Sequence, residues 1–198
     1  MNLTACGVSL VGQFLGIDSP ITIIQMLWVN IIMDTLGGLA FAGEPALEYY
    51  MKEKPKSRSE RILSREMLHQ IFFTGAYTLF LCIAFLQADI FREAFGGTVD
   101  NSYFMTAFYA LFIFAGIFNC FGARCERMWI LSKIGKNKPF VVIMSFISVI
   151  QILMIYHGGS VFRTVPITAR SLIYVILLAA SVLPFEMIRR VFYKLRRR

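Results

Sequence analysis

Five long apolar segments constrain what this chain can fold into more than any other feature of its sequence. At the 1.5 Å rise per residue of an α-helix, each of them is long enough to cross roughly 30 Å of lipid hydrocarbon. The segments are about Ile21–Ala42, Met67–Gln87, Tyr103–Ala123, Phe140–Tyr156 and Ser171–Ile188. They predict an all-α membrane protein, a bundle of about five full transmembrane helices plus a partial one at the N-terminus.

A shorter apolar stretch precedes these five segments and accounts for the partial helix. Leu3–Ile17 has only about 15 residues, with Gly7, Gly12 and Gln13 among them. This length is short for a full crossing of the hydrocarbon layer. The stretch is therefore either a re-entrant segment or the second half of a helix that begins upstream.

The composition agrees with a membrane protein, because 57% of the residues are hydrophobic, 16% are charged and the mean hydropathy is +0.64. A soluble domain of this size needs more charge to cover its surface. The net charge of +8 does not indicate a nucleic-acid partner, because the cations are grouped between apolar segments. Of 20 Lys and Arg, six lie in Lys52–Arg65, five in Arg124–Lys138 and six in Arg189–Arg198.

The same grouping predicts the orientation of the chain, since short cytoplasmic loops carry an excess of Lys and Arg. We expect Lys52–Arg65, Arg124–Lys138 and the C-terminal tail Arg189–Arg198 to be cytoplasmic. The connections Asp89–Asn101 and His157–Arg170 carry few cations and are expected outside. The connections alternate between cation-rich and cation-poor along the chain. This alternation predicts an integral multi-pass protein with a cytoplasmic C-terminus.

One apolar stretch, Leu27–Pro45, reads LWVNIIMDTLGGLAFAGEP and carries Asn30 and Asp34 near its middle. On a helix, residues four apart lie one turn apart on the same face. A carboxylate at membrane depth costs about 3 kcal/mol on insertion scales, so it marks a functional site by default. An ionised carboxylate with amide and backbone carbonyl oxygens suits a hard cation such as Ca²⁺. We expect Gly37 and Gly38 to weaken the helix and let its backbone unwind toward the ion.

The alternative for this pair is structural, with a protonated Asp34 that is hydrogen-bonded to a neighbouring helix. Other polar residues in the apolar segments also have structural interpretations. Asn119 with Arg124 is expected to orient a helix end, and Glu186 is expected to pair with Arg189 and Arg190 at helical spacing.

Helix ends and breaks are predicted from turn residues. Asp18 or Ser19 is expected to cap the second apolar helix, with Pro20 in its first turn. Pro184 lies inside the last apolar segment and is expected to kink it.

The sequence carries no recognisable catalytic machinery. It has no Walker loop, no Asp-Lys-Thr-Gly-Thr phosphorylation sequence and no nucleophile elbow. The four cysteines form no CxxC pair, and small apolar packing residues are the simplest interpretation of them.

The stretch LWVNIIMDTLGGLAFAGEP, preceded by QM, closely resembles the sixth transmembrane helix of P-type calcium ATPases. The WVN, IIM and DT groups followed by GEP look like the plasma-membrane (type IIB) branch and its bacterial relatives, whereas reticulum-type pumps typically have Thr at the place of Met33. The later LSREM and FNCFGARC also resemble the family. The chain therefore looks like the C-terminal transmembrane domain of such a pump, a fragment with helices five to ten.

The resemblance implies a division of the chain into three parts. Residues 1–17 are the truncated fifth helix, residues 20–43 are the ion-site helix and residues 67–190 are four supporting helices, all within one domain over 1–198. It implies that Asn30 and Asp34 are ion ligands. Cys6 stands where the fifth helix of the family has an Asn in its Gln-Leu-Thr-x-Asn pattern, and Cys120 lies where some relatives place an acidic ligand. Because a thiol is a poor Ca²⁺ ligand, these departures fit a pump with a single ion site.

The function implied by the resemblance is the membrane-embedded ion-translocation part of an ATP-driven Ca²⁺ exporter, a translocase of the cell membrane. ATP and Mg²⁺ would act only through domains that this chain lacks, so the chain alone should not hydrolyse ATP. The implied partners are membrane lipid, upstream transmembrane helices and the phosphorylation domain, which would contact Lys52–Arg65. The alternatives are a non-catalytic membrane fragment or scaffold, and the same fold exporting another cation such as Mn²⁺ or H⁺.

Overall fold

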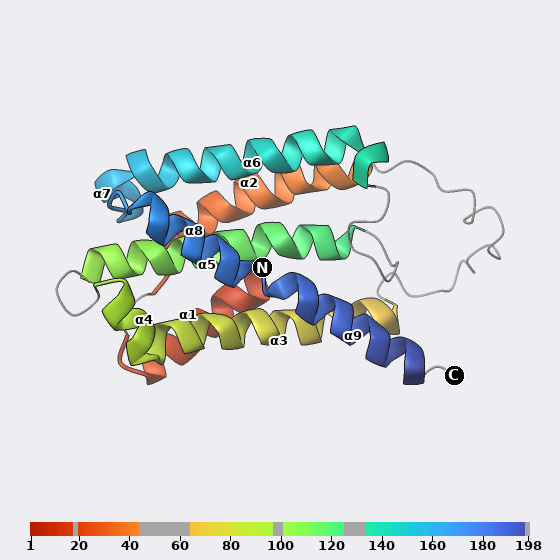
Figure 1. Cartoon of the computed structure of the whole chain (residues 1–198), viewed down its shortest axis with the longest axis horizontal. Helices are drawn as coiled ribbons and strands as arrows, with labels where there is room; N and C mark the ends of the chain where they lie inside the picture. The colour runs from red at the N-terminus through yellow and green to blue at the C-terminus, as the bar shows by residue number, and fades with distance from the viewer. Residues whose placement is uncertain (18–19, 44–63, 97–100, 125–133, 197–198) are drawn as a thin grey trace.

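The computed structural model describes residues 1–17, 20–43, 64–96, 101–124 and 134–196, and every regular element in these ranges is a helix (Figure 1). Expressed by their bounds, the elements are α1 (Asn2–Phe14), α2 (Ile23–Ala42), α3 (Arg65–Gln87), α4 (Asp89–Ala94), α5 (Asn101–Ala123), the 3-10 helix η2 (Ile134–Lys136), α6 (Lys138–His157), α7 (Gly159–Phe162), α8 (Ala169–Ala179) and α9 (Val182–Arg196).

Five stretches of helix are long and apolar enough to cross a membrane. They are Ile23–Ala42, Met67–Gln87, Asn101–Ala123, Lys138–His157 and Ala169–Tyr193. Each coincides with one of the predicted segments, so the predicted fold class is confirmed. The first helix, α1, has 13 residues and therefore a length of about 20 Å, which is short of a full crossing.

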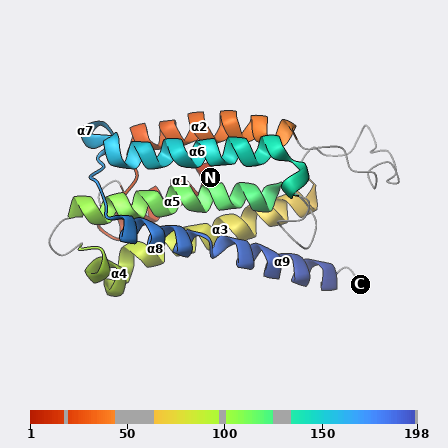
Figure 2. The same cartoon turned by 45° about the horizontal axis from the view of Figure 1, so that its top comes forward.

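The helix α5 forms the centre of the bundle. Every residue from Thr106 to Ile117 is buried, as expected for a helix that is apolar on all sides. Figures 1 and 2 show α5 between the α2–α6 pair on one side and α3 with α8 and α9 on the other, and α1 packs along α3. Phe85 of α3 stacks on Phe104 of α5 at 5.3 Å between ring centroids, which joins the two helices near one end of the bundle.

The start of α2 differs from the expectation. The helix begins at Ile23 and is capped by Thr22, whose Oγ1 accepts a hydrogen bond from the Gln25 N–H at 3.2 Å. In return, Gln25 Oε1 accepts from the Thr22 N–H at 2.8 Å, which completes a capping box. A cap at Asp18 or Ser19 is therefore wrong for this helix, although both residues lie outside the described ranges.

The last membrane-spanning segment is broken near Pro184, as predicted. Because proline has no N–H, Pro184 cannot donate to the Ala180 carbonyl four residues earlier. The Leu183 N–H donates to that carbonyl instead, at 3.0 Å. Tyr77 of α3 supports the break, since its Oη donates to Ser181 Oγ at 2.9 Å and its ring stacks on Phe185 at 4.1 Å.

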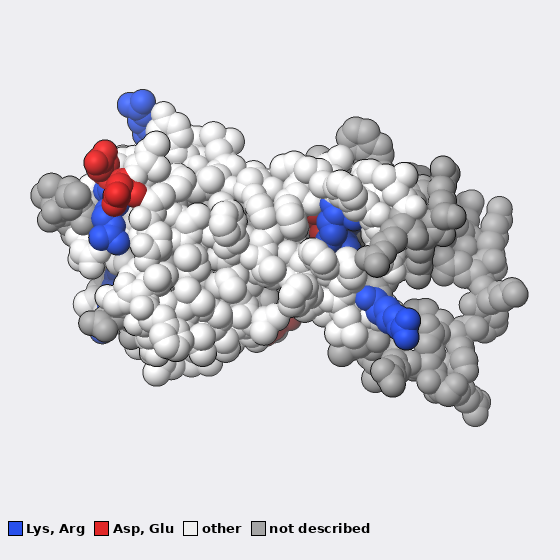
Figure 3. Space-filling model, turned by 90° about the horizontal axis from the view of Figure 1, so that it is seen from below, with Lys and Arg blue, Asp and Glu red and all other residues white. Residues whose placement is uncertain are grey.

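On the face shown in Figure 3, charged side chains lie at one end of the bundle and in the half toward the other end, with a largely uncharged belt between them. One end carries the N-terminus of α3, the start of α6 and the C-terminus of α9; the other carries α4, α7 and the start of α8 (Figure 1). The belt is what a spanning bundle presents to hydrocarbon. The connection Lys52–Arg65 falls almost entirely outside the described residues.

Candidate ion site

The predicted polar pair lies on α2, where Asn30 and Asp34 are one helical turn apart on the same face. Asp34 is exposed and Asn30 is half-buried. Within the described part of the chain, neither side chain makes a hydrogen bond or an ion pair. The structural alternative, a protonated Asp34 bonded to a neighbouring helix, therefore has no hydrogen bond to support it among these residues.

The packing of α2 explains why this pair is not covered. The buried residues of the helix form one stripe, which faces α6; they are Gln25, Val29, Met33, Gly37 and Ala40. Each residue of the polar pair follows a stripe residue directly and is therefore turned by about 100° around the helix axis. The pair lies beside the packed face, while the Met33 thioether is buried in that face and does not share the surface of Asp34.

The backbone of α2 does not unwind at its two glycines, so that expectation is wrong. The helix continues through Gly37 and Gly38 to Ala42, and the Gly43 N–H still donates to the Leu39 carbonyl at 3.3 Å. A Cβ atom at either glycine would meet no heavy atom within 4 Å. The intact hydrogen bonds mean that the carbonyls of this turn are engaged within the helix and are not displayed as ion ligands.

The helix α5 approaches Asp34 through Cys120, and the start of α1 packs on the same part of α5. Cys120 of α5 is half-buried and lies within electrostatic reach of both the Asp34 carboxylate and the amino terminus. The Met1 side chain packs against Gly116 of α5, close enough that a Cβ there would lie 2.5 Å from Met1 Cε. Figure 1 accordingly shows the N-terminus near the middle of the long axis.

The described residues contain no group of three or more His, Cys, Asp or Glu that is placed to hold a metal ion. Cys6 is exposed on α1 and does not form such a group with Asp34 and Cys120. The structure thus brings Cys120 toward the predicted pair and leaves Cys6 out. Asn30 and Asp34 alone offer too few oxygens for the six to eight that Ca²⁺ takes, so they form part of a cation site at most.

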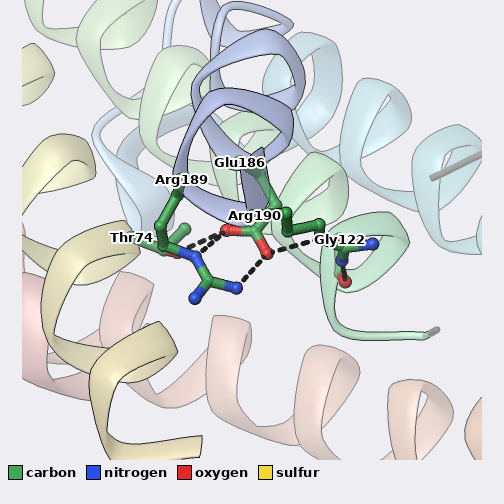
Figure 4. Close-up of polar contacts among 5 residues, drawn as sticks. All are labelled: Thr74, Gly122, Glu186, Arg189 and Arg190. Atoms are coloured by element: carbon green, nitrogen blue, oxygen red, sulfur yellow. Dashed lines mark hydrogen bonds and ion pairs between the residues drawn. The ribbon is translucent and has the colours of Figure 1, made fainter. Parts of the chain in front are cut away.

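Sequence reasoning missed the extent of a second polar cluster, which connects the N-terminal part of α9 to α3 and α5 (Figure 4). The Glu186 carboxylate is only 1% exposed and pairs with Arg189 at 2.6 Å and with Arg190 at 3.0 Å, as the helical spacing predicted. Thr74 of α3 donates its hydroxyl to Glu186 Oε2 at 2.9 Å, and Arg190 Nη2 donates to the Gly122 carbonyl of α5. The cluster joins α3, α5 and α9, and both Glu186 oxygens are occupied.

Asn119 also links two helices, although in a different way from the one expected. Its Nδ2 donates to Thr78 Oγ1 of α3 at 3.2 Å, so it contributes to packing between α5 and α3. The Arg124 guanidinium lies 5.5 Å from the ring centroid of Phe140 and thus fixes the end of α5 against α6.

Residues 18–192 match the family described as "Cation transporting ATPase, C-terminus". The chain belongs to this family.

The chain is similar to curated calcium-transporting ATPases of the plasma-membrane type. Calcium-transporting ATPase 2 of Arabidopsis thaliana is 32% identical over 187 residues, which are 93% of this chain and 18% of the relative. Calcium-transporting ATPase 10 of Oryza sativa subsp. japonica is 32% identical over 174 residues, which are 86% of this chain and 17% of the relative. Plasma membrane calcium-transporting ATPase mca-1 of Caenorhabditis elegans is 30% identical over 192 residues, which are 92% of this chain and 15% of the relative.

This cation-transporting ATPase C-terminal region therefore spans less than a fifth of the length of these relatives. Five apolar helices together with such relatives establish a multi-pass membrane protein. The resemblance to P-type calcium ATPases is confirmed at the level of the family.

Proposed function

We propose that this chain is the membrane-embedded ion-translocation part of an ATP-driven Ca²⁺ exporter, and that Asn30 and Asp34 contribute to its cation site. The observation that carries the proposal is an apolar, membrane-spanning helix with a carboxylate and an amide on one face. Neither group is satisfied by the described residues of the chain. In a protein without a transport role, so costly a carboxylate would be expected to have a protein partner.

The chemistry of the pair favours a hard cation. Asp34 provides two carboxylate oxygens and Asn30 one amide oxygen, whereas the Cys120 thiol nearby is a poor partner for Ca²⁺. We infer that the remaining oxygen ligands come from helices that are not part of this chain and that approach the exposed side of α2. A pump of this kind would bind one ion here.

The motor of the pump would also lie outside the 198 residues. The proposed division, with residues 1–17 as part of a fifth helix, 20–43 as the ion-site helix and 67–190 as supporting helices, leaves no segment for phosphorylation or nucleotide binding. ATP and Mg²⁺ would act in other domains, and Lys52–Arg65 is the segment proposed to contact them. Phosphorylation of those other domains would tilt α2 relative to its neighbours and expose the cation alternately on the two sides of the membrane.

The test is ATP-dependent uptake of radioactive Ca²⁺ by inside-out vesicles that contain the full-length pump. We expect Asp34→Ala to reduce uptake to the level measured without ATP, because it removes the only anionic group on this face of α2. Asn30→Ala should weaken the apparent Ca²⁺ affinity, since it removes one neutral ligand.

Asp89→Ala is the matched control, because Asp89 is an exposed carboxylate on α4 at one end of the bundle and should leave uptake unchanged. Normal transport by Asp34→Ala would refute the assignment of this ligand. Competition by Mn²⁺ or by a pH gradient in the same vesicles distinguishes Ca²⁺ from the alternative cargoes.

A further inference from the structure

The helices α4 and α8 meet at the end of the bundle opposite the C-terminus of α9 (Figure 2). A groove opens between their side chains there. Its volume is about 640 Å³. The walls are mainly apolar, with Ile90, Phe91 and Ala94 from α4 and with Tyr174 and Leu178 from α8. In a membrane-spanning chain, such a groove faces hydrocarbon or the interface just above it, so apolar chains rather than water are available to fill it.

The rim of the groove carries one fixed cation. The Nε and Nη2 of Arg170 both donate to the Tyr174 hydroxyl at 3.2 Å, and the guanidinium lies 5.6 Å from the centre of that ring. Arg170 forms no ion pair with any described carboxylate. A guanidinium has five N–H donors, so most of its capacity remains for an acceptor from outside the chain.

The position of the groove agrees with the boundary between hydrocarbon and headgroups. Helix α4 exposes Asp89 and Glu93 on one side, while Ile90 on the groove side is 70% exposed. Arginine and tyrosine at the start of a spanning helix are typical of the interfacial layer, where an apolar stem and a polar tip meet different solvents. The groove thus has an apolar body at hydrocarbon depth and a cationic mouth at headgroup depth.

We propose that this groove binds one phospholipid, with an acyl chain between α4 and α8 and with its phosphate on Arg170. Arginine suits a phosphate because its planar donors match two oxygens at once. The volume lies in the range of small-molecule sites and fits a single chain, whereas a partner helix is about 10 Å across and would not enter. The single cation matches the single phosphate of the headgroup.

The experiment uses the full-length protein in lipid nanodiscs that contain a trace of phosphatidylglycerol with a diazirine on its acyl chain. After illumination, mass spectrometry measures the labelling of the α4 and α8 peptides relative to a lipid-facing peptide of α6 around Phe146, which is 56% exposed. A long-chain alcohol with the same diazirine serves as the probe without a phosphate. We expect phospholipid labelling to be enriched in the groove peptides.

Two pairs of variants test the two halves of the site. Arg170→Gln should lower groove labelling by the phospholipid about fivefold without affecting the alcohol, since one interfacial arginine contributes roughly that factor. Arg163 is an exposed arginine at the same end of the bundle, and Arg163→Gln should change groove labelling by neither probe. Ala94→Trp should fill the groove and abolish labelling by both probes, whereas Leu177→Trp, at an exposed position outside the groove lining, should not.

Arg170→Lys keeps the charge and should restore most of the phospholipid labelling, which separates loss of binding from loss of folding. Labelling of the groove peptides that equals that of the α6 peptide, or that Arg170→Gln leaves unchanged, would overturn the proposal. Cross-links from these peptides to another protein chain would also overturn it, because a protein would then be the occupant.

Discussion

At the scale of single residues, the buried carboxylate of Glu186 and the exposed carboxylate of Asp34 have opposite environments. Glu186 is 1% exposed and is satisfied by two arginines and a threonine, whereas Asp34 is exposed and makes no bond with described residues. A fully satisfied carboxylate of this kind holds helices together. An unsatisfied one at membrane depth is available for a ligand.

The Glu186 cluster predicts a large stability effect. Glu186→Gln leaves Arg189 and Arg190 nearly buried without their anion, so we expect it to destabilise the protein by about 3–5 kcal/mol. Thr74→Val removes one hydrogen bond to the carboxylate and should cost about 1–3 kcal/mol. Thermal unfolding of the purified protein in detergent measures both.

Glu93→Gln is the control for this prediction, because Glu93 is exposed on α4. This variant should unfold at the same temperature as the unaltered protein. If Glu186→Gln unfolds at the same temperature as the control, the cluster does not stabilise the bundle.

At the scale of elements, two glycines in neighbouring helices have different roles. A Cβ on Gly122 of α5 would lie 3.2 Å from Glu186 Cγ, so this glycine permits the close approach of α9. A Cβ on Gly38 of α2 would meet nothing within 4 Å, and the helix is regular there. Close packing through small residues is a common way for membrane helices to associate.

Alanine substitutions should therefore act in opposite directions. We expect Gly122→Ala to destabilise the protein by about 1–3 kcal/mol through overpacking. Gly38→Ala should stabilise α2 by up to about 1 kcal/mol, because alanine is the better helix former. Thermal unfolding measures the difference between the two variants, and equal effects of the same sign would contradict these assignments.

Ca²⁺ uptake by the Gly38→Ala variant then tests whether the glycines of α2 are needed for motion during transport. If the glycines serve the motion of α2 during transport, the variant loses Ca²⁺ uptake without losing stability. The expectation from the sequence that the helix unwinds at this point was wrong for this structure, because its backbone hydrogen bonds can all be made locally with Gly37 and Gly38 in place.

At the scale of the whole molecule, the alternation of helices predicts which end of the bundle faces the cytoplasm. We expect Glu93→Cys on α4 to react with a membrane-impermeant maleimide in intact cells. Lys138→Cys at the start of α6 should react only after permeabilisation, because the cation-rich end is expected inside.

The unaltered protein, with its native cysteines, gives the background for both measurements. The reverse labelling pattern would contradict the predicted orientation. It would also place the proposed phospholipid of the α4–α8 groove in the cytoplasmic leaflet.

The sequence by itself determined the number, the approximate extent and the helical nature of the membrane spans. Each span satisfies its backbone hydrogen bonds within its own segment, so length and hydropathy are sufficient to predict it. The same holds for the break at Pro184 and for the shared face of Asn30 and Asp34, which depend on neighbours within a few residues along the chain.

Only the tertiary structure decided which of these helix faces are buried and what they contact. Glu186 meets Thr74, 112 residues away in sequence, and Arg190 meets Gly122, 68 residues away. No local pattern encodes such distances, because they depend on how the helices pack around α5. The same packing turns the stripe through Met33 toward α6 and leaves Asp34 beside it uncovered, which is the physical basis of the proposed cation site.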